Sequence, residues 1–327
     1  MKRLVNISLI FLTAMGVLTS CVHEMPKTDG VAREVQLNIH HQMEWSPTYE
    51  MTVTRSESAG YKARYHFKLY RAGDKETVIS EQEFLSDDLT RADFSTRLNL
   101  PPGDYDLWTW SDWADIENEK SLHFDSSDFS SICYSEPYRG NNDLRDALRG
   151  VVTFTVEQNL DGHYRKDVDL TLTRPLAKYE FIATDLADFI ENESTRGKLA
   201  RSAPDLTGYR VKMLYTGYMP SEYNNFIDKP VNSRTGMSYD ATITALNDSE
   251  ALLGFDYVMV NGHESSVPVA MEIYDRNGDL IGRTNSIDVP TMRNRLTVVR
   301  GKFLTSKASG GVGINPDFNG DYNIEIK

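Results

Sequence analysis

The residues that could carry catalysis do not fall into the patterns that enzymes use. The sequence contains no Gly-x-Ser-x-Gly turn, no phosphate-binding loop and no dinucleotide-binding fingerprint. His263-Glu264 begins like a zinc-protease motif, but Val267 stands where the second histidine ligand would be. His40 and His41 are neighbours, and on a strand they would point to opposite faces. We therefore predict that the protein is not an enzyme and holds neither a metal ion nor a cofactor.

Two acidic segments place oxygen atoms at alternate positions, as calcium loops do. They are residues 275–279 and 317–321, each with an Asn-Gly pair between aspartates. A calcium loop of the EF-hand type has its glycine sixth and a glutamate twelfth. Here the glycine is fourth, and the twelfth residue counted from Asp275 is Ser286. We therefore interpret both segments as tight turns, which favour the same residues for conformational reasons.

The two cysteines have different expected roles. Two basic residues and an apolar stretch over residues 4–18 lead into the run Leu-Thr-Ser-Cys that ends at Cys21, which resembles the bacterial lipobox. We therefore predict a signal peptide over residues 1–20 and a lipidated tether over residues 21–32. Several acyl chains on Cys21 would anchor the protein durably to a membrane. The alternative is an ordinary signal peptide with an incidental cysteine. Cys133 is then left without a disulfide partner, and we expect a buried free thiol.

Three tryptophans lie close together in one expected strand. Trp108 and Trp110 alternate with Tyr105 and Leu107, so the two pairs point to opposite faces. If exposed, Trp108, Trp110 and Trp113 would form a platform for sugar rings or for a partner strand. The alternative, which we favour, is that both faces are covered and that the tryptophans pack in the core.

Composition excludes one class of partner. The chain has 327 residues and a formal net charge of -13. An acidic surface repels phosphate backbones, so we predict no nucleic-acid partner. The hydrophobic content of 40% and aromatic content of 10% are typical of folded protein, and the length allows two domains.

Period-two alternation dominates the rest of the chain, which is typical of half-buried strands. Val35, Leu37 and Ile39 begin the pattern, and it recurs around residues 65–70, 98–100, 105–110, 152–156, 168–172, 179–181, 209–216, 252–260, 267–274, 280–288, 295–304 and 322–326. Short helices are expected after a cap at Asp185 and over residues 143–149. Asn277-Gly278 predicts a type I′ hairpin turn.

These patterns predict an all-β protein built from two tandem β-sandwich domains with one or two short helices. Arg174-Pro175 is the expected junction, because proline has no N–H for a central strand. The predicted domains cover residues 33–173 and 174–327.

The order of several motifs resembles one family. After the lipobox come Leu100-Pro-Pro-Gly-Asp-Tyr-Asp-Leu-Trp108 and further segments at residues 142–147, 174–178, 293–304 and 318–324. In this order the chain resembles the FimB/Mfa-like (fimbrillin-related) fimbrial lipoproteins of Bacteroides-type bacteria, over most of its mature length.

The resemblance implies transthyretin-like sandwiches and a non-enzymatic role as an anchor or accessory subunit of type V pili. In that family an extended terminal segment of one subunit fills a groove in the next, and fimbrial subunits are the partners. Pilins lose their first strand when a protease cuts after an arginine, whereas anchors keep it. The matching residues here are the arginines Arg33 and Arg55, Val35, Leu37 and Ile39 in the first strand, and Tyr322, Ile324 and Ile326 in the last.

The sequence also indicates a membrane location and leaves one rival function open. The resemblance implies attachment to the outer membrane through the lipid on Cys21. Export to the surface is linked in this family to an acidic stretch after the cysteine, and here Glu24 is the one acid in residues 22–25. The rival is a lipid-anchored carbohydrate-binding or nutrient-capture protein that uses exposed tryptophans.

Overall fold

The computed structural model describes residues 31–44, 60–158, 164–200, 204–262, 265–305 and 322–326. These residues form many strands, one α-helix and one short 3-10 helix, so the all-β prediction is confirmed. None of the helices in the described ranges is long and apolar enough to cross a membrane.

The first sandwich packs a three-stranded sheet against a four-stranded one. The first sheet has the order β4 (Arg91–Leu100), β1 (Arg33–Met43), β9 (Tyr164–Leu172), and the second has the order β3 (Ser80–Ser86), β2 (Tyr61–Arg71), β5 (Gly103–Asp115), β8 (Leu148–Val156). β1 lies in the middle of its sheet, antiparallel to β4 and parallel to β9. Alternate residues of β1 point inward, and they pack with those of β2, β5 and β9 in one apolar core.

The second sandwich repeats this arrangement with longer sheets. One sheet has the order β15 (Thr244–Ala245), β16 (Ala251–Met259), β10 (Leu176–Ala183), β20 (Leu296–Gly301), β21 (Tyr322–Ile326), with β10 antiparallel to β16 and parallel to β20. The other has the order β14 (Ser238–Thr242), β11 (Arg210–Tyr215), β17 (Ser265–Tyr274), β18 (Leu280–Arg283), and β19 (Ile287–Thr291) also pairs with β17. The predicted junction at Arg174 falls between β9 and β10.

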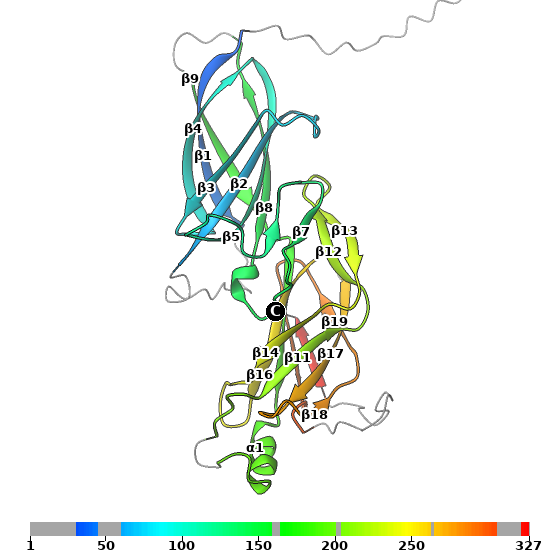
Figure 1. Cartoon of the computed structure of the whole chain (residues 1–327). Coiled ribbons are helices and arrows are strands. Elements are labelled where there is room, and N and C mark those ends of the chain that lie inside the picture. The colour runs from blue at the N-terminus through cyan, green and yellow to red at the C-terminus, as the bar shows by residue number, and fades with distance from the viewer. Residues whose placement is uncertain are drawn as a thin grey trace, which may run out of the picture.

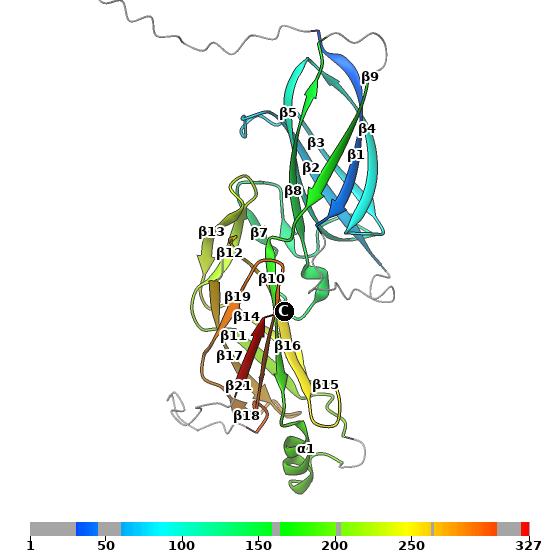
Figure 2. The same cartoon turned by 180° about the vertical axis from the view of Figure 1, so that it is seen from behind.

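A small antiparallel sheet, which we call the bridging sheet, joins the two halves. It has the order β13 (Lys229–Arg234), β12 (Met219–Asn224), β7 (Ile132–Tyr134), β6 (Phe124–Asp125), so strands from both halves of the chain lie side by side. Figures 1 and 2 show the two sandwiches end to end, with this sheet beside their junction. The apolar core of the second sandwich continues through it to Trp108 and Trp110 of β5.

Three local expectations need correction. The helix expected over residues 143–149 is only the 3-10 helix η1 (Asp143–Arg145), because Arg149 exchanges two backbone hydrogen bonds with Thr173 and belongs to β8. The helix α1 (Leu186–Thr195) does begin after Asp185, but the carboxylate of Asp185 makes no cap bond. It accepts instead from the backbone N–H of Thr305 at 2.8 Å.

The hairpin between β17 and β18 exists, but its turn is not of type I′. A type I′ turn needs positive φ at both central residues, and only Gly278 has it, at +84°. Asp275 sets the turn, since its carboxylate accepts the N–H groups of Asn277 at 2.9 Å and of Asp279 at 3.0 Å. Lys198 Nζ lies 2.5 Å from the same carboxylate, so the positive charge beside Asp275 is that of a lysine.

Candidate functional site

The first strand is held on both sides and buried on one face. The β1 ladder to β4 runs from the pair Arg33–Leu100 to the pair Gln42–Arg91, and the ladder to β9 runs alongside it. Val35, Leu37 and Ile39 are at most 1% exposed. The strand is therefore part of the core of the first sandwich.

The other face of β1 is polar and carries a network across three strands. Asn38 donates to Asp167 on β9 at 2.6 Å, and Ser95 on β4 donates to Asn38 at 2.8 Å. His40 lies 2.8 Å from Asp93 on β4, and this hydrogen bond raises the pKa of His40. Side-chain contacts thus tie β1 to both neighbours in addition to its backbone ladder.

His41 points to the opposite face, as the adjacent positions required. Its ring packs against the rings of Tyr65 at 4.9 Å and Phe67 at 5.1 Å, and its Nδ1 lies 3.2 Å from the carbonyl oxygen of Ala92. Burial lowers the pKa of His41 to about 4. The two histidines cannot converge on one ion, and the described ranges contain no group of three or more metal-ligating side chains suited to a metal.

The last strand, β21, lies at the edge of its sheet and pairs with β20. Ile324 packs against the core of the second sandwich, whereas Ile326 is 39% exposed. Tyr322 pairs with Gly301 in the ladder. β21 therefore adds a rim to a core that the other strands complete.

The processing residues fall at or beyond the limits of the described ranges. Arg33 is the first residue of β1 and is half-buried. Cys21 and Arg55 lie outside the described residues, as do His263 and Glu264. The second acidic segment, residues 317–321, also lies outside them. Cys133 is a free but only half-buried thiol, and desolvation raises its pKa.

The tryptophans do not form an exposed platform. Trp108 is 7% exposed, Trp110 0% and Trp113 4%. The ring of Phe226, from the turn between β12 and β13, stands edge-on to Trp108 with centroids 5.1 Å apart. Trp110 packs against Phe124 of β6 in the same way, at 5.3 Å. The exposed-platform hypothesis is wrong, because the bridging sheet covers the outer face of β5.

Trp113 points the other way, into the core of the first sandwich, together with Tyr105 and Leu107. The alternation of the sequence predicted which residues share a face. It did not reveal what covers the outer face, because Phe226, which covers Trp108, comes from more than 100 positions further along the chain.

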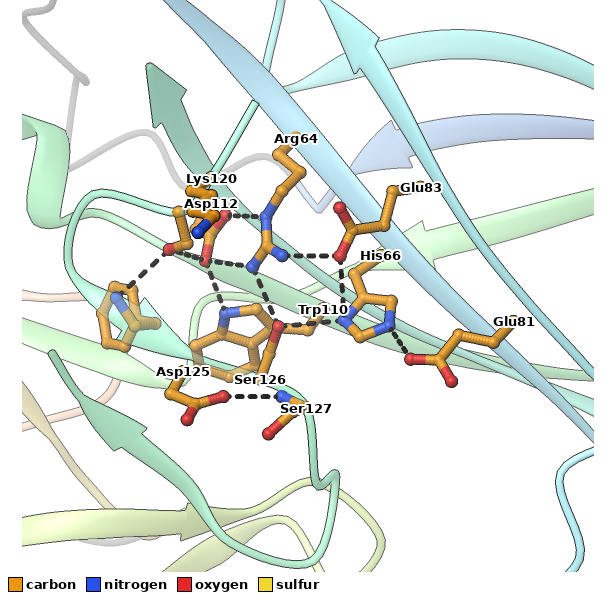
Figure 3. Close-up of polar contacts among 12 residues, drawn as sticks. Arg64, His66, Glu81, Glu83, Trp110, Asp112, Lys120, Asp125, Ser126 and Ser127 are labelled. Atoms are coloured by element: carbon orange, nitrogen blue, oxygen red, sulfur yellow. Dashed lines mark hydrogen bonds and ion pairs between the residues drawn. The ribbon is translucent and has the colours of Figure 1, made fainter. Parts of the chain in front are cut away.

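A polar cluster lies on the covered face of β2 and β5 (Figure 3). The guanidinium of Arg64 donates two hydrogen bonds to Asp112, each 2.9 Å long, and a further one to Glu83 at 2.8 Å. Arg64 also donates to Ser126 at 2.8 Å, and Ser121 donates to Asp112 at 2.7 Å. The cluster therefore fastens the segment that leads to and follows β6 onto the first sandwich.

Within this cluster Ser126, His66 and Glu81 are arranged like the serine, histidine and acid of a hydrolase triad. Ser126 Oγ lies 2.9 Å from His66 Nδ1, and Glu81 lies 2.7 Å from His66 Nε2 (Figure 3). A nucleophile must reach a substrate, but Ser126 is only 2% exposed and its oxygen already accepts from Arg64. Burial lowers the pKa of His66. We interpret the group as structural; the sequence signal was the unusual run of polar residues on one face of β2.

The segments that carried the family resemblance meet at the junction between the sandwiches. Arg174 makes two hydrogen bonds of 2.7 Å to Asp146, and it also bonds the side-chain oxygen of Asn294. Arg145 forms an ion pair of 2.9 Å with Asp256, and both side chains are at most 1% exposed. These motifs are therefore residues of the joint.

Tyrosines surround this buried pair. The guanidinium of Arg145 lies over the rings of Tyr134 at 4.6 Å and Tyr138 at 4.4 Å. Tyr215 donates to Asp256 at 2.7 Å, and burial raises the pKa of Tyr215 well above its usual value, so its hydroxyl remains a donor. The carboxylate is thus satisfied without water, as buried charge requires.

Comparison with known proteins gives one matching family and several similar solved structures. A family of unknown function (DUF6562) matches residues 27–327. No curated protein matches the chain.

The similar solved structures include fimbrial proteins. The fimbrial anchor protein Mfa2 from Porphyromonas gingivalis has 13% identity and a TM-score of 0.43, over 83% of this chain and 90% of that one. A fimbrial assembly protein from Parabacteroides distasonis has 11% identity and a TM-score of 0.41, over 91% and 99%. The tip fimbrial protein Mfa3 from Porphyromonas gingivalis, with a C-terminal truncation, has 10% identity and a TM-score of 0.41, over 90% and 99%.

Proposed function

The chain belongs to a family of unknown function (DUF6562), and we propose that it is a lipid-anchored anchor or accessory subunit of a fimbrial assembly. It acts without catalysis, by joining other fimbrial subunits through added strands. The proposal rests on the motifs of the sequence and on the different positions of its first and last strands.

The observation that carries the proposal is the place of β1. This strand fills the middle of a three-stranded sheet, so its removal would leave a groove between β4 and β9. Such a groove has unpaired backbone groups on both sides and an apolar floor, and an extended segment could fill it. In an anchor β1 stays, and the first sandwich remains closed to incoming strands.

The half-buried Arg33 supports a retained strand. Arg33 already pairs with Leu100 in the ladder, and the side-chain network of β1 follows close behind. A protease binds its substrate as an extended segment, so cleavage after Arg33 would first require this end of β1 to leave the sheet.

β21 supplies the surface that faces partners. It occupies a sheet edge, and an edge strand offers backbone groups to another chain. Its half-exposed Ile326 adds an apolar side chain at this edge. The predicted lipid on Cys21 would hold the opposite end of the chain at the outer membrane, ahead of β1.

The test compares two variants with equal exposure at the changed residue. Ile326 on β21 and Val151 on β8 are each 39% exposed, so Ile326→Asp and Val151→Asp place the same charge at similar depth. The variants are expressed in the native host, cross-linked, and pulled down with the fimbrial subunits that accompany them. We expect Ile326→Asp to lower the recovery of fimbrial subunits by about tenfold, while Val151→Asp keeps it.

A second measurement addresses the anchor role. Mass spectrometry of the native protein, with and without an arginine-specific protease, should find an acylated Cys21 still joined to β1. Loss of the chain through Arg33 with the appearance of higher oligomers would make it a polymerising subunit instead.

In the pull-down, equal recovery of fimbrial subunits with Ile326→Asp and Val151→Asp would contradict assembly through β21.

A further inference from the structure

Lys178, Asp143 and Glu180 form a close group where η1 meets β10. Lys178 Nζ lies 2.9 Å from Asp143 Oδ1 and 3.2 Å from Glu180 Oε1. The side chain of Lys178 is 8% exposed, and those of the two acids are 22% exposed. One ammonium thus faces two carboxylates in a place that little water reaches.

Aromatic residues of β16 form the wall of this site. The Nζ atom of Lys178 lies 4.4 Å from the ring centre of Phe255 and 5.5 Å from that of Tyr257. The hydroxyl of Tyr257 donates to Asp143 Oδ1 at 2.8 Å. The amine is therefore held against the carboxyl group, and a fixed donor polarises the oxygen that would remain as a carbonyl.

We propose that Lys178 and Asp143 condense to an isopeptide bond, with Glu180 as the group that moves protons. The Nζ atom attacks Cγ of Asp143, a C–N bond forms, and one C–O bond of the carboxyl group breaks. The nitrogen loses two protons, and both leave with the departing oxygen as one water molecule. Glu180 accepts a proton from the nitrogen and delivers it to that oxygen, so it returns to its starting state.

This reaction needs no oxidant and no cofactor, since an ammonium and a carboxylate give a neutral amide and water. Its chief requirement is that the two groups stay in contact. Fixed proximity lowers the activation free energy of such a step, because the entropy of bringing the groups together is already lost. Glu180 is two residues from Lys178 on one strand, so both side chains leave the same face of β10. Burial keeps bulk water from the amide once it has formed.

The bond would join residues 35 positions apart and cross the junction between the sandwiches. It would tie η1, which leads into β8 of the first sandwich, to the first strand of the second. The inference is independent of the proposed function, because the cross-link is a property of this one chain.

The test is the mass of the full-length protein, solubilised in detergent and measured intact and after trypsin. We expect an intact mass about 18 Da below that of the processed, acylated chain, the mass of one water. Trypsin should not cut after Lys178, and residues 140–145 should appear joined to residues 167–196. Cleavage after Lys178, or an intact mass without the loss, would overturn the proposal.

Two controls separate this bond from other losses of water. Lys198 also contacts an aspartate, Asp275 at 2.5 Å, but its side chain is 37% exposed; it should remain free, and trypsin should cut after it. A succinimide elsewhere gives the same intact mass with only linear peptides, and that result would also overturn the proposal. Glu180→Gln should retain the fold but not the cross-link, and a cross-link at wild-type level in this variant would remove Glu180 from its role.

Discussion

The first strands of the two sandwiches occupy equivalent positions but are held in different ways. β1 and β10 each lie between one antiparallel and one parallel neighbour. β1 has one buried face and one polar face that solvent reaches, whereas β10 is buried along nearly its whole length on both faces. A strand of the first kind should open at lower cost, because solvent already reaches one of its faces. A strand of the second kind is a permanent part of the core.

The surroundings of the two strands explain the difference. β10 follows directly on Arg174, which is bound to Asp146, and η1 lies against it through Lys178. β1 follows the predicted tether, and its side-chain partners include two exposed acids, Asp93 on β4 and Asp167 on β9. The contrast predicts that β1 opens more readily than β10, although in an anchor both strands stay in their sheets.

The largest effect should come from the pair that precedes β10. Arg174→Met leaves the carboxylate of Asp146, which is 0% exposed, without its cation. We expect a loss of about 3–5 kcal/mol in the free energy of unfolding, because an unpaired buried charge is costly. The measurement is chemical denaturation of the purified protein.

The matched control is the exposed pair between Arg276 and Asp205, whose side chains are 40% and 63% exposed. Arg276→Met should cost less than about 1 kcal/mol, because water screens such pairs. Equal effects of the two variants would contradict the view that buried charge holds β10.

The next effect tests whether the bridging sheet couples the sandwiches. Trp108→Ala removes a ring that packs on Phe226, and we expect a loss of about 3–4 kcal/mol from the cavity and the lost contact. Val151, the ladder partner of Trp108, is half-exposed, so Val151→Ala should cost little. Hydrogen exchange should show faster opening of β12 and β13 in Trp108→Ala; protection equal to wild type there would mean that the sandwiches are not coupled at this place.

Acid should loosen the first sandwich selectively. Burial lowers the pKa of folded His41 to about 4, so the folded state binds fewer protons than the unfolded state once the pH falls below the ordinary histidine pKa. The contribution of His41 alone to the free energy of unfolding should therefore fall by about 2 kcal/mol between pH 7 and pH 5. His66, whose pKa burial also lowers, acts in the same direction.

Hydrogen exchange at the two pH values tests this difference. Within residues 174–327 the sequence has a single histidine, His263, so strands of the second sandwich should change less. In His41→Leu, the hydrogen-exchange protection of β1 should differ less between pH 7 and pH 5. An equal loss of protection in β10 and β1 would break the comparison.

The smallest effect should come from His40. Its hydrogen bond to Asp93 raises its pKa, so its contribution to stability is complete below the ordinary histidine pKa and is lost as the pH rises through the raised value. His40→Gln should therefore weaken β1 slightly at pH 6 and not at pH 9. Because the side chain is 43% exposed, salt should reduce the effect; an effect that grows with pH would contradict it.

Much of the fold could be predicted from the sequence, because strand alternation is a local property. The period of two places Val35, Leu37 and Ile39 on one face whatever their partners are, and the structure buries all three. The same local reasoning separated Trp108 and Trp110 from Tyr105 and Leu107. Proline at position 175 predicted a break, and a strand ends before it and another begins after it.

The candidate site depended on contacts between distant residues. Arg174 and Asp146 are 28 positions apart, and Trp108 is covered by a hairpin of the other half of the chain. The carboxylate of Asp185 bonds Thr305 and leaves the helix cap unmade, because a tertiary partner competes with the local one. Local alternation of residue types is enough to set which side chains point inward. The pairing of charges and the covering of aromatic faces arise on folding, because both require segments that chain order does not place together.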